Sequence, residues 1–251
     1  MNGKGFMPQS LSMRILLMVV SLLVVSFAGI IWYVNMASYR LAYSDQLNNV
    51  QDLSRVTALA LEDAVASSLH MVKGLAVQPA VVRALETGED PGDAVQGMLG
   101  ATVRTEKEIW SLYAFDRTGK PVAGLTNSGA AERGKDKSKH LVVREILAGK
   151  PEVVDQEVAL SDGGRPVYRV AVAVRDAKGN VAGGVQMSLS LDAFAATYIN
   201  PVKIGENGYL FVMDKDGRII IHPRDQSLML KVVELPINKE ITTRKNGNKF
   251  D

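Results

Sequence analysis

The amino-acid sequence predicts an α+β fold in which helices come first and a largely antiparallel sheet follows. Three observations lead to this prediction. Residues 15–34 form an uncharged apolar run, residues 37–75 contain no proline, and short β-like runs separated by turns begin at Ile109. The chain has 251 residues, 47 % of them hydrophobic and 22 % charged, so it can bury a core and does not have the composition of a disordered protein.

The apolar run Ile15–Val34 predicts a transmembrane helix, because twenty residues at about 1.5 Å each span the roughly 30 Å of hydrocarbon in a bilayer. Trp32 lies near its end, where aromatic rings favour the interface. Lys4 and Arg14 precede the run and no acid does, so residues 1–14 are expected to be a cytoplasmic tail and the rest of the chain to lie outside. A cleaved signal peptide is the alternative, but its apolar region would be shorter and followed by an A-x-A site.

Residues 35–75 are expected to form a long helix that continues from the membrane span. Small and apolar residues at 3-4 spacing make a heptad-like seam on it, and a second apolar line runs beside the seam. The seam either packs on the helix's own domain or joins two parallel helices in a homodimer. The seam consists of Val50, Leu53, Thr57, Ala60, Ala64, Ser67 and Met71, and the second line of Leu61, Val65, Leu69 and Val72.

After this helix, Pro79 and the glycines at 88 and 92 bracket one short helix, and Asp93–Glu106 favours another. Alternating and β-rich runs then predict an antiparallel meander, interrupted by one helix that stops before Pro151. The strands are expected at Ile109–Asp116, Pro121–Leu125, Val153–Leu160, Val167–Arg175 and Val181–Leu191, and the helix at Lys137–Leu147.

Three turns of the form Asp-x-x-Gly join pairs of apolar runs, and two of them belong to a longer repeat. Leu112–Asp116 (LYAFD) matches Leu210–Asp214 (LFVMD) at an offset of 98 residues. The repeat suggests two copies of one module. We therefore expect a module at residues 76–200 and a second at 201–251. The second is expected to be incomplete, as if the chain were part of a larger receptor.

The sequence offers little catalytic chemistry. It has no cysteine, and His70, His140 and His222 share no metal-binding spacing. Gly129–Lys135 reads G-x-x-x-x-G-K, but Asp136 follows where a phosphate-binding loop needs Ser or Thr for Mg²⁺. We expect no enzymatic activity, no cofactor and no metal. The net charge of +2 argues against a nucleic-acid binder.

The candidate ligand-binding residues lie near the first module's helix and strands. His140 and Arg144 are four residues apart on the expected helix, so both can face one pocket that takes a small anion. Trp110, Tyr113 and Tyr168 are candidate aromatic walls, with packing in the core as the alternative for each. Strand alternation places Trp110 and Tyr113 on opposite faces, so at most one of the two is expected to line the pocket.

Three segments resemble the double Cache sensor region of a bacterial methyl-accepting chemotaxis protein, which consists of two PAS-like modules. The most specific is Ile204–Pro223 (IGENGYLFVMDKDGRIIIHP), similar to the family's membrane-proximal signature. Lys139–Lys150 (KHLVVREILAGK) and Gly179–Phe194 (GNVAGGVQMSLSLDAF) support it. The resemblance implies a ligand pocket in the membrane-distal module, a homodimer along the first helix, and a location in the inner membrane with the sensor outside the cytoplasm.

The sequence departs from the amino-acid-binding version of this domain. His140-Leu141-Val142 stands where that version has Arg-x-Trp, and Ser188 stands where it has a carboxylate that grips the ligand. The resemblance therefore places Ser188 in the site but favours a carboxylate or another small metabolite over an amino acid. We expect the ligand-sensing region of a transmembrane chemoreceptor. The alternatives are the same sensor on a histidine kinase or a cyclic-dinucleotide enzyme, or an anchored structural module without a ligand.

Overall fold

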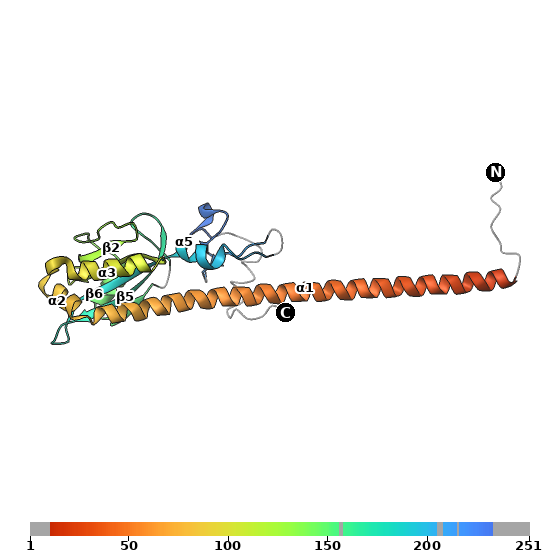
Figure 1. Cartoon of the computed structure of the whole chain (residues 1–251), viewed down its shortest axis with the longest axis horizontal. Coiled ribbons are helices and arrows are strands. Elements are labelled where there is room, and N and C mark those ends of the chain that lie inside the picture. The colour runs from red at the N-terminus through yellow and green to blue at the C-terminus, as the bar shows by residue number, and fades with distance from the viewer. Residues whose placement is uncertain (1–10, 156–157, 205–207, 215, 233–251) are drawn as a thin grey trace. The chain divides into compact units, whose positions relative to one another are not determined.

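The computed structural model describes residues 11–155, 158–204, 208–214 and 216–232. The chain divides into two units, Met1–Arg55 and Val56–Asp251, and helix α1 (Leu11–Ala76) contributes residues to both. Figure 1 shows the helices and strands along the chain. The α+β class is confirmed, since a long first helix precedes short helices and an antiparallel sheet.

In the first unit, α1 presents its apolar residues on an exposed surface. Phe27 and Trp32 expose 62 % and 70 % of their area. Ser21 donates its hydroxyl to the carbonyl of Met18 at 2.9 Å, which satisfies the proton of a polar side chain within the helix. Within the described part of the chain, α1 is the one helix that is long and apolar enough to cross a bilayer, judged by its length and composition.

The helices that follow in the second unit have local signals at their ends. Pro79 lacks an N–H and therefore suits a first turn, while Gly88 ends the same helix with a φ of 75°. Asp90 caps the next helix, because its carboxylate accepts the N–H groups of Val95 and Gln96 at 3.0 and 2.8 Å. The helices are α2 (Pro79–Thr87), α3 (Ala94–Thr105), α4 (Leu141–Leu147) and α5 (Leu191–Phe194), and a π-helical turn follows at Ala195–Ile199.

The main sheet is antiparallel in the order β2-β1-β6-β5-β3, with β4 also pairing with β5. The expected meander is wrong in one respect, because β6 returns to lie between β1 and β5. The single strand expected at Val153–Leu160 is two short strands instead. The strands are β1 (Ile109–Asp116), β2 (Pro121–Thr126), β3 (Glu152–Val154), β4 (Ala159–Leu160), β5 (Pro166–Arg175) and β6 (Val181–Ser190).

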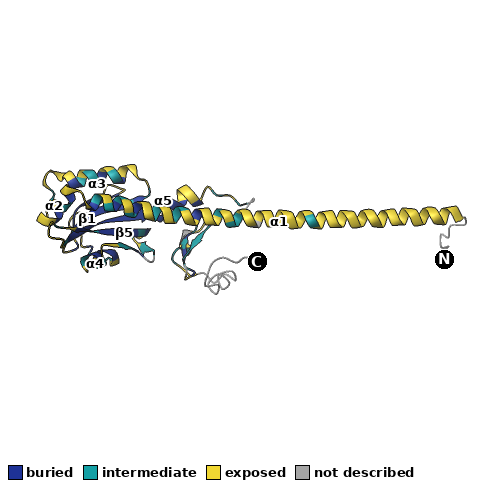
Figure 2. Ribbon diagram, turned by 90° about the horizontal axis from the view of Figure 1, so that it is seen from below, coloured by how far each residue is buried: buried dark blue, intermediate teal, exposed yellow. Residues whose placement is uncertain are grey.

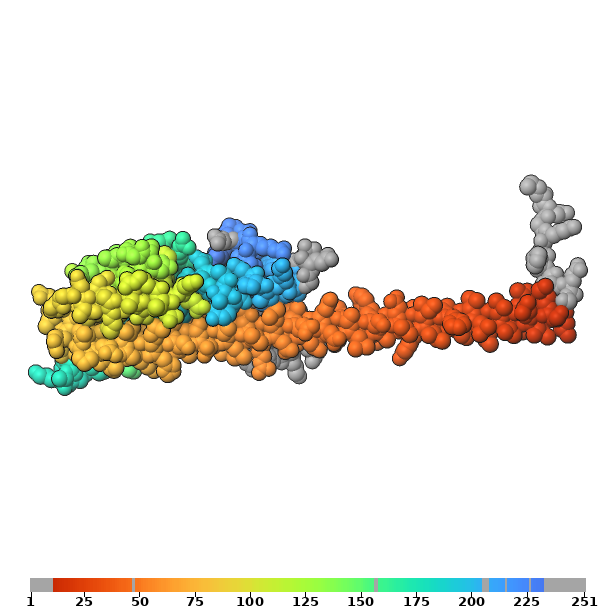
Figure 3. All heavy atoms as spheres, viewed as in Figure 1, coloured from red at the N-terminus to blue at the C-terminus, as the bar shows by residue number. Residues whose placement is uncertain are grey.

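The two faces of this sheet carry separate cores. Leu112, Val170 and Met187 pack with the last turns of α1 and with α2 and α3. Tyr113 and Phe115 point to the other face, where they pack with α4. Figure 2 shows α3 and α4 on opposite sides of the sheet, and Figure 3 shows how the side chains of α2 and α3 cover the first face. The polar residues of the candidate site lie on the α4 face.

The three Asp-x-x-Gly turns have the geometry that the sequence predicts. Asp116, Asp176 and Asp214 each accept the backbone N–H groups of the residues two and four positions later, at 2.8 to 3.2 Å. Each glycine then adopts a φ of about 80°, a conformation that glycine reaches without strain. The positive φ values belong to Gly119, Gly179 and Gly217.

The second copy of the repeated motif, at residues 210–214, contains β7 (Val212–Met213). This strand pairs with β8 (Ile219–Ile221) in a second, two-stranded antiparallel sheet. Tyr209 precedes β7 and His222 follows β8, and the Tyr209 hydroxyl lies 3.2 Å from Nε2 of His222. Residues 233–251 of the expected second module lie outside the described residues. The predicted module boundaries therefore stay a prediction.

The heptad-like seam of α1 is used inside the chain. Ala60, Ala64 and Met71 line a cavity of about 260 Å³ that β6 residues, including Met187, border on the other side. Val65 and others of the second line belong to the core of the same face. Between Val56 and Ala76, the second line therefore packs largely on its own domain, while the seam borders this cavity and stays partly exposed. The dimer contact along the seam stays a prediction.

Candidate functional site

A cavity of about 280 Å³ opens on the α4 face of the main sheet. Its floor comes from β1, β5 and β6, and its walls come from β2, from the segment before α4 and from the loop between β4 and β5. The lining residues are Trp110, Ser111, Tyr113, Thr126, Ser128, Ala130, Glu132, Lys135, Lys137, His140, Ser161, Asp162, Gly163, Arg169, Gln186 and Ser188.

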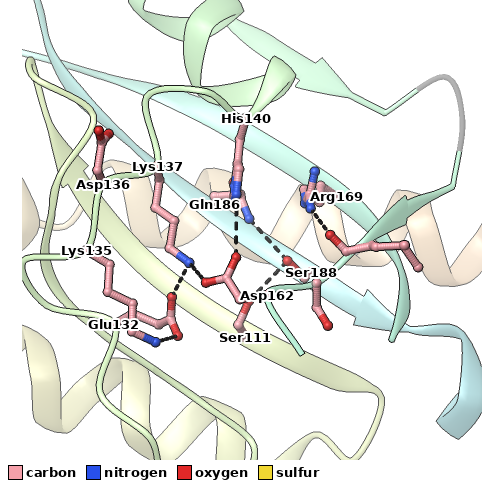
Figure 4. A network of polar contacts seen from close by, with 12 residues as sticks. Ser111, Glu132, Lys135, Asp136, Lys137, His140, Asp162, Arg169, Gln186 and Ser188 are labelled. Carbon is pink, nitrogen blue, oxygen red and sulfur yellow. Dashed lines mark hydrogen bonds and ion pairs between the residues drawn. The ribbon is translucent and has the colours of Figure 1, made fainter. Parts of the chain in front are cut away.

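The floor is built from rows of residues that pair across strands. Ser188 on β6 lies opposite both Ser111 on β1 and Arg169 on β5. In the next row, Gln186 lies opposite Tyr113. Directly paired residues share a face of the sheet, and so do residues two apart on one strand. The pairing register therefore brings five polar side chains from three strands to one surface, and Figure 4 labels four of them, Ser111, Arg169, Gln186 and Ser188.

Hydrogen bonds along this floor leave the hydroxyl proton of Ser188 without an acceptor among the described residues. Tyr113 donates to Oε1 of Gln186 at 2.5 Å, and Nε2 of Gln186 donates to Oγ of Ser188 at 3.1 Å. Ser111 also donates to Oγ of Ser188, again at 3.1 Å. Because Ser188 accepts two hydrogen bonds, its own hydroxyl proton is available to a group inside the cavity.

A cluster of two lysines and two carboxylates lies along one wall (Figure 4). The buried ammonium of Lys137 lies 2.6 Å from Glu132 and 2.5 Å from Asp162, and Lys135 lies 2.7 Å from Glu132. The hydrogen bond from Lys137 lowers the pKa of Asp162. Two positive and two negative charges balance within this cluster, so a ligand has no net charge to neutralise there.

His140 lines the cavity and contacts Tyr113 of the floor. Its Nδ1 lies 3.2 Å from the Tyr113 hydroxyl, whose proton goes to Gln186, so Nδ1 is the donor in this contact. Burial lowers the pKa of His140, and the positive charges of Arg169 and Lys137 lower it further. The ring is therefore neutral at pH 7 and takes part as a hydrogen-bonding group.

Arg169 lies outside this cluster. The residue is only 8 % exposed, and its Nη2 donates to the carbonyl of Leu160 at 2.6 Å. Within the described part of the chain, no carboxylate lies within 4.0 Å of its guanidinium. A guanidinium has five N–H donors and keeps its charge when buried. The cavity floor thus holds a desolvated positive charge beside the free hydroxyl proton of Ser188, and a carboxylate matches both groups.

Residues 35–250 match the family model described as a Cache domain. The chain belongs to the Cache-domain family. Cache domains are extracytoplasmic sensor domains that bind small molecules and typically have no enzymatic activity.

Solved structures with the same fold come from several kinds of receptor. A domain of a sensory box/GGDEF family protein from Vibrio parahaemolyticus has a TM-score of 0.63 at 11 % identity, over 79 % of this chain and 78 % of that one. The ligand-binding domain of the Pseudomonas aeruginosa amino acid chemoreceptor PctC, in complex with GABA, gives 0.54 at 24 %, over 74 % and 78 %. The sensor domain of the V. cholerae histidine kinase DctB gives 0.56 at 18 %, over 71 % and 67 %.

Four of the six predicted site residues of this Cache domain line the cavity, namely Trp110, Tyr113, His140 and Ser188. Arg144 does not, because α4 begins at Leu141 and not at Lys137 as expected. His140 therefore precedes the helix in an extended conformation, and the spacing of four no longer places the two side chains together. Arg144 is exposed on α4.

Tyr168 also lies outside the cavity lining. It is adjacent to Arg169 on β5, so strand alternation turns its side chain to the other face.

Trp110 and Tyr113 both line the cavity, which corrects the expectation that only one of them can. The pairing of β1 with β6 shifts between Ile109 and Ser111, so Trp110 occupies an irregularity in the ladder. Such a bulge re-aims the side chain it contains. Strict alternation along β1 therefore holds for Ser111 and Tyr113 but fails at Trp110.

Sequence reasoning missed Arg169, Gln186, Lys137, Asp162 and Glu132. For two of them a signal existed, because Arg169 and Gln186 are polar residues within otherwise apolar strand runs. A charge in a buried strand needs a partner or a function. Glu132 and Asp162 belong to loops, where local sequence gives no such signal.

Ser188→Ala is expected to weaken carboxylate binding about fivefold to tenfold, since one net hydrogen bond contributes roughly 1 kcal/mol. Binding is read from Trp110 fluorescence in a Trp32→Phe background, which leaves one tryptophan. Ser190→Ala is the control, because Ser190 caps α5 by accepting the N–H of Ala193 and lies outside the cavity lining. Equal binding by the Ser188 variant and the wild type would contradict a role for this hydroxyl.

Proposed function

We propose that this chain is the ligand-sensing region of a transmembrane chemoreceptor. Residues 15–34 cross the inner membrane, residues 1–14 are cytoplasmic, and the Cache domain lies outside. The exposed apolar surface of α1 and the positive residues before it support this arrangement. The membrane-distal module, residues 76–200, holds the ligand, and residues 201–251 begin the membrane-proximal module.

The ligand is a small molecule that carries a carboxylate. The observation behind this proposal is the buried guanidinium of Arg169, which lines the cavity without a carboxylate partner in the described residues. Trp110, Tyr113, His140 and Ser188 complete the site. An open cavity that exposes a buried guanidinium with no carboxylate in contact also argues against a structural module that binds nothing, because a buried charge without a close partner destabilises a protein.

The ligand signals by binding two arrangements of the receptor with different affinities. A ligand shifts an equilibrium between two arrangements only when it binds them with different affinities. The cavity floor and the last turns of α1 lie on opposite faces of the same sheet. A ligand that draws β1, β5 and β6 together can therefore alter how α1 packs. We propose that the receptor is a homodimer along α1, with exposed residues such as Val56 and Leu59 in the contact.

The test is a ligand screen of the chain in lipid nanodiscs. Acetate, pyruvate, L-lactate, succinate and GABA, which all carry a carboxylate, are compared with putrescine and glucose by thermal shift and by Trp110 fluorescence in the Trp32→Phe background. We expect at least one carboxylate to bind and the neutral sugar and the diamine to be silent. A panel in which no acid binds would remove the support for a carboxylate sensor.

A second candidate is the same sensor on a histidine kinase or a cyclic-dinucleotide enzyme. The fold is shared with a histidine kinase sensor and with a GGDEF-family protein as well as with a chemoreceptor. The output domain that accompanies the sensor in the full gene separates these candidates, because the sensor fold itself is shared.

A further inference from the structure

Asp155 is a buried acid that the site described above does not use. The residue is 4 % exposed, and its Oδ2 has no hydrogen-bond partner among the residues that the structure describes. It follows β3, and its N–H donates to the carbonyl of Arg169 at 2.9 Å. An orphaned carboxylate oxygen in a buried position is costly, so its retention calls for an explanation.

The sheet register places this carboxyl next to Arg169. Val154 pairs with Val170, so Asp155 lies opposite Arg169 on the neighbouring strand. Val153 packs in the α4-side core, and Asp155, two residues later, shares that face. The floor row Ser111, Ser188, Arg169 therefore continues into Asp155.

The pair is close enough to interact electrostatically but does not form an ion pair. Arg169 turns its Nη2 to the carbonyl of Leu160, and the two charges stay more than 4.0 Å apart. Burial raises the pKa of Asp155 to about 6, and the nearby charge of Arg169 opposes that rise. The positive charge on the cavity floor therefore has two candidate counter-ions, Asp155 from within the sheet and a ligand from the cavity.

We propose that Asp155 is a positioning residue that competes with a bound carboxylate for the charge of Arg169, so that ligand binding is coupled to uptake of a proton by Asp155. This inference rests on the proposed carboxylate site. When a carboxylate binds Arg169, ionised Asp155 meets a second negative charge and loses its counter-ion. Protonation of Asp155 removes both penalties, and the sensor then reads an acid together with the pH.

The surrounding titratable groups do not produce the same response above pH 6. On β5, Tyr168 has its pKa raised by burial, and on β1 the pKa of Tyr113 is raised well above its usual value, so both stay protonated. The pKa of Asp162, in the loop before β5, is lowered, so it stays ionised. Glu132 forms ion pairs with Lys135 and Lys137. Burial and the charges of Arg169 and Lys137 lower the pKa of His140, and the His140→Asn variant separates the contribution of this ring from that of Asp155.

The experiment measures the Kd of acetate between pH 6 and 8.5 by Trp110 fluorescence, with the chain in nanodiscs and the ionic strength fixed by chloride. In the wild type, the Kd is expected to rise above pH 6 by up to tenfold per unit, the limit for one coupled proton. Asp155→Asn is expected to bind with a nearly constant Kd and to bind more tightly than the wild type at pH 8. Asp155→Ala also removes the carboxyl group and keeps the backbone hydrogen bond to Arg169. The same result in both variants excludes a folding defect caused by asparagine as the explanation.

His140→Asn is the matched control, because it removes the other titratable ring of the cavity and should keep the wild-type slope. A wild-type Kd that does not change with pH, or an unchanged slope in Asp155→Asn, overturns the coupling and leaves the carboxylate site intact. A slope lost only in His140→Asn assigns the proton to His140 and overturns the role of Asp155. If neither acetate nor any other acid of the panel binds, the carboxylate site itself fails, and the coupling fails with it.

Discussion

Replacing Arg169 by glutamine is expected to weaken carboxylate binding by about thirtyfold to several thousandfold. Loss of one partner from a desolvated charge pair costs roughly 2–5 kcal/mol, and Arg169 is the one cavity cation that has no carboxylate within 4.0 Å among the described residues. Arg169→Lys keeps the charge but loses the planar fork, so its affinity should lie between those of the wild type and Arg169→Gln. The affinity is measured by Trp110 fluorescence with the acid of the panel that binds most tightly.

The matched control for this change lies on the same strand. Arg175 ends β5 and donates to the carbonyls of Gly179 and Gly149, outside the cavity. Arg175→Gln removes the same charge from the chain and should bind the acid as the wild type does. If the two glutamine variants lost affinity equally, long-range charge would explain the loss, and direct contact with Arg169 would be refuted. Circular dichroism at 25 °C confirms that each variant is folded.

Local sequence signals predict the elements well where a residue's own neighbours determine its conformation. The bounds of β1 agree with the expected Ile109–Asp116, and the three Asp-x-x-Gly turns have the expected caps. These features depend on side-chain alternation and on hydrogen bonds within four residues. Glu132 differs, because its place beside the cavity depends on a loop path that no local pattern specifies.

The errors all concern contacts between distant segments. That β6 lies between β1 and β5 follows from a pairing between residues more than 65 apart, such as Phe115 with Gly184. The bulge at Trp110 arises in that same pairing. Lys137 was expected on a helix but is buried against Asp162, 25 residues away, and the start of α4 moves accordingly. Arg169 is the exception, since its position within an apolar run was visible in the sequence.

Asp155→Asn is expected to stabilise the folded state at pH 8. The folded-state pKa of Asp155 is about 6 against an ordinary value of 3.8, so the folded protein holds this proton more tightly than the unfolded chain. The stability that this provides is complete below pH 3.8 and is lost as the pH rises through about 6. At about 1.36 kcal/mol per unit, the difference of 2.2 units amounts to about 3 kcal/mol that the wild type has lost by pH 8 and that the variant keeps.

For a domain of this size, that difference corresponds to a rise in Tm of roughly 6–12 °C. Thermal unfolding is followed by Trp110 fluorescence in the Trp32→Phe background without ligand, and the gap between variant and wild type should close as the pH falls toward 4. Asp162→Asn is the control of opposite sign. The hydrogen bond from Lys137 lowers the pKa of Asp162, so this variant should be less stable than the wild type at neutral pH, and the difference should vanish in acid as the wild-type Asp162 becomes protonated. An equal Tm for Asp155→Asn and the wild type at pH 8 would mean that Asp155 is not buried as a charged group beside Arg169.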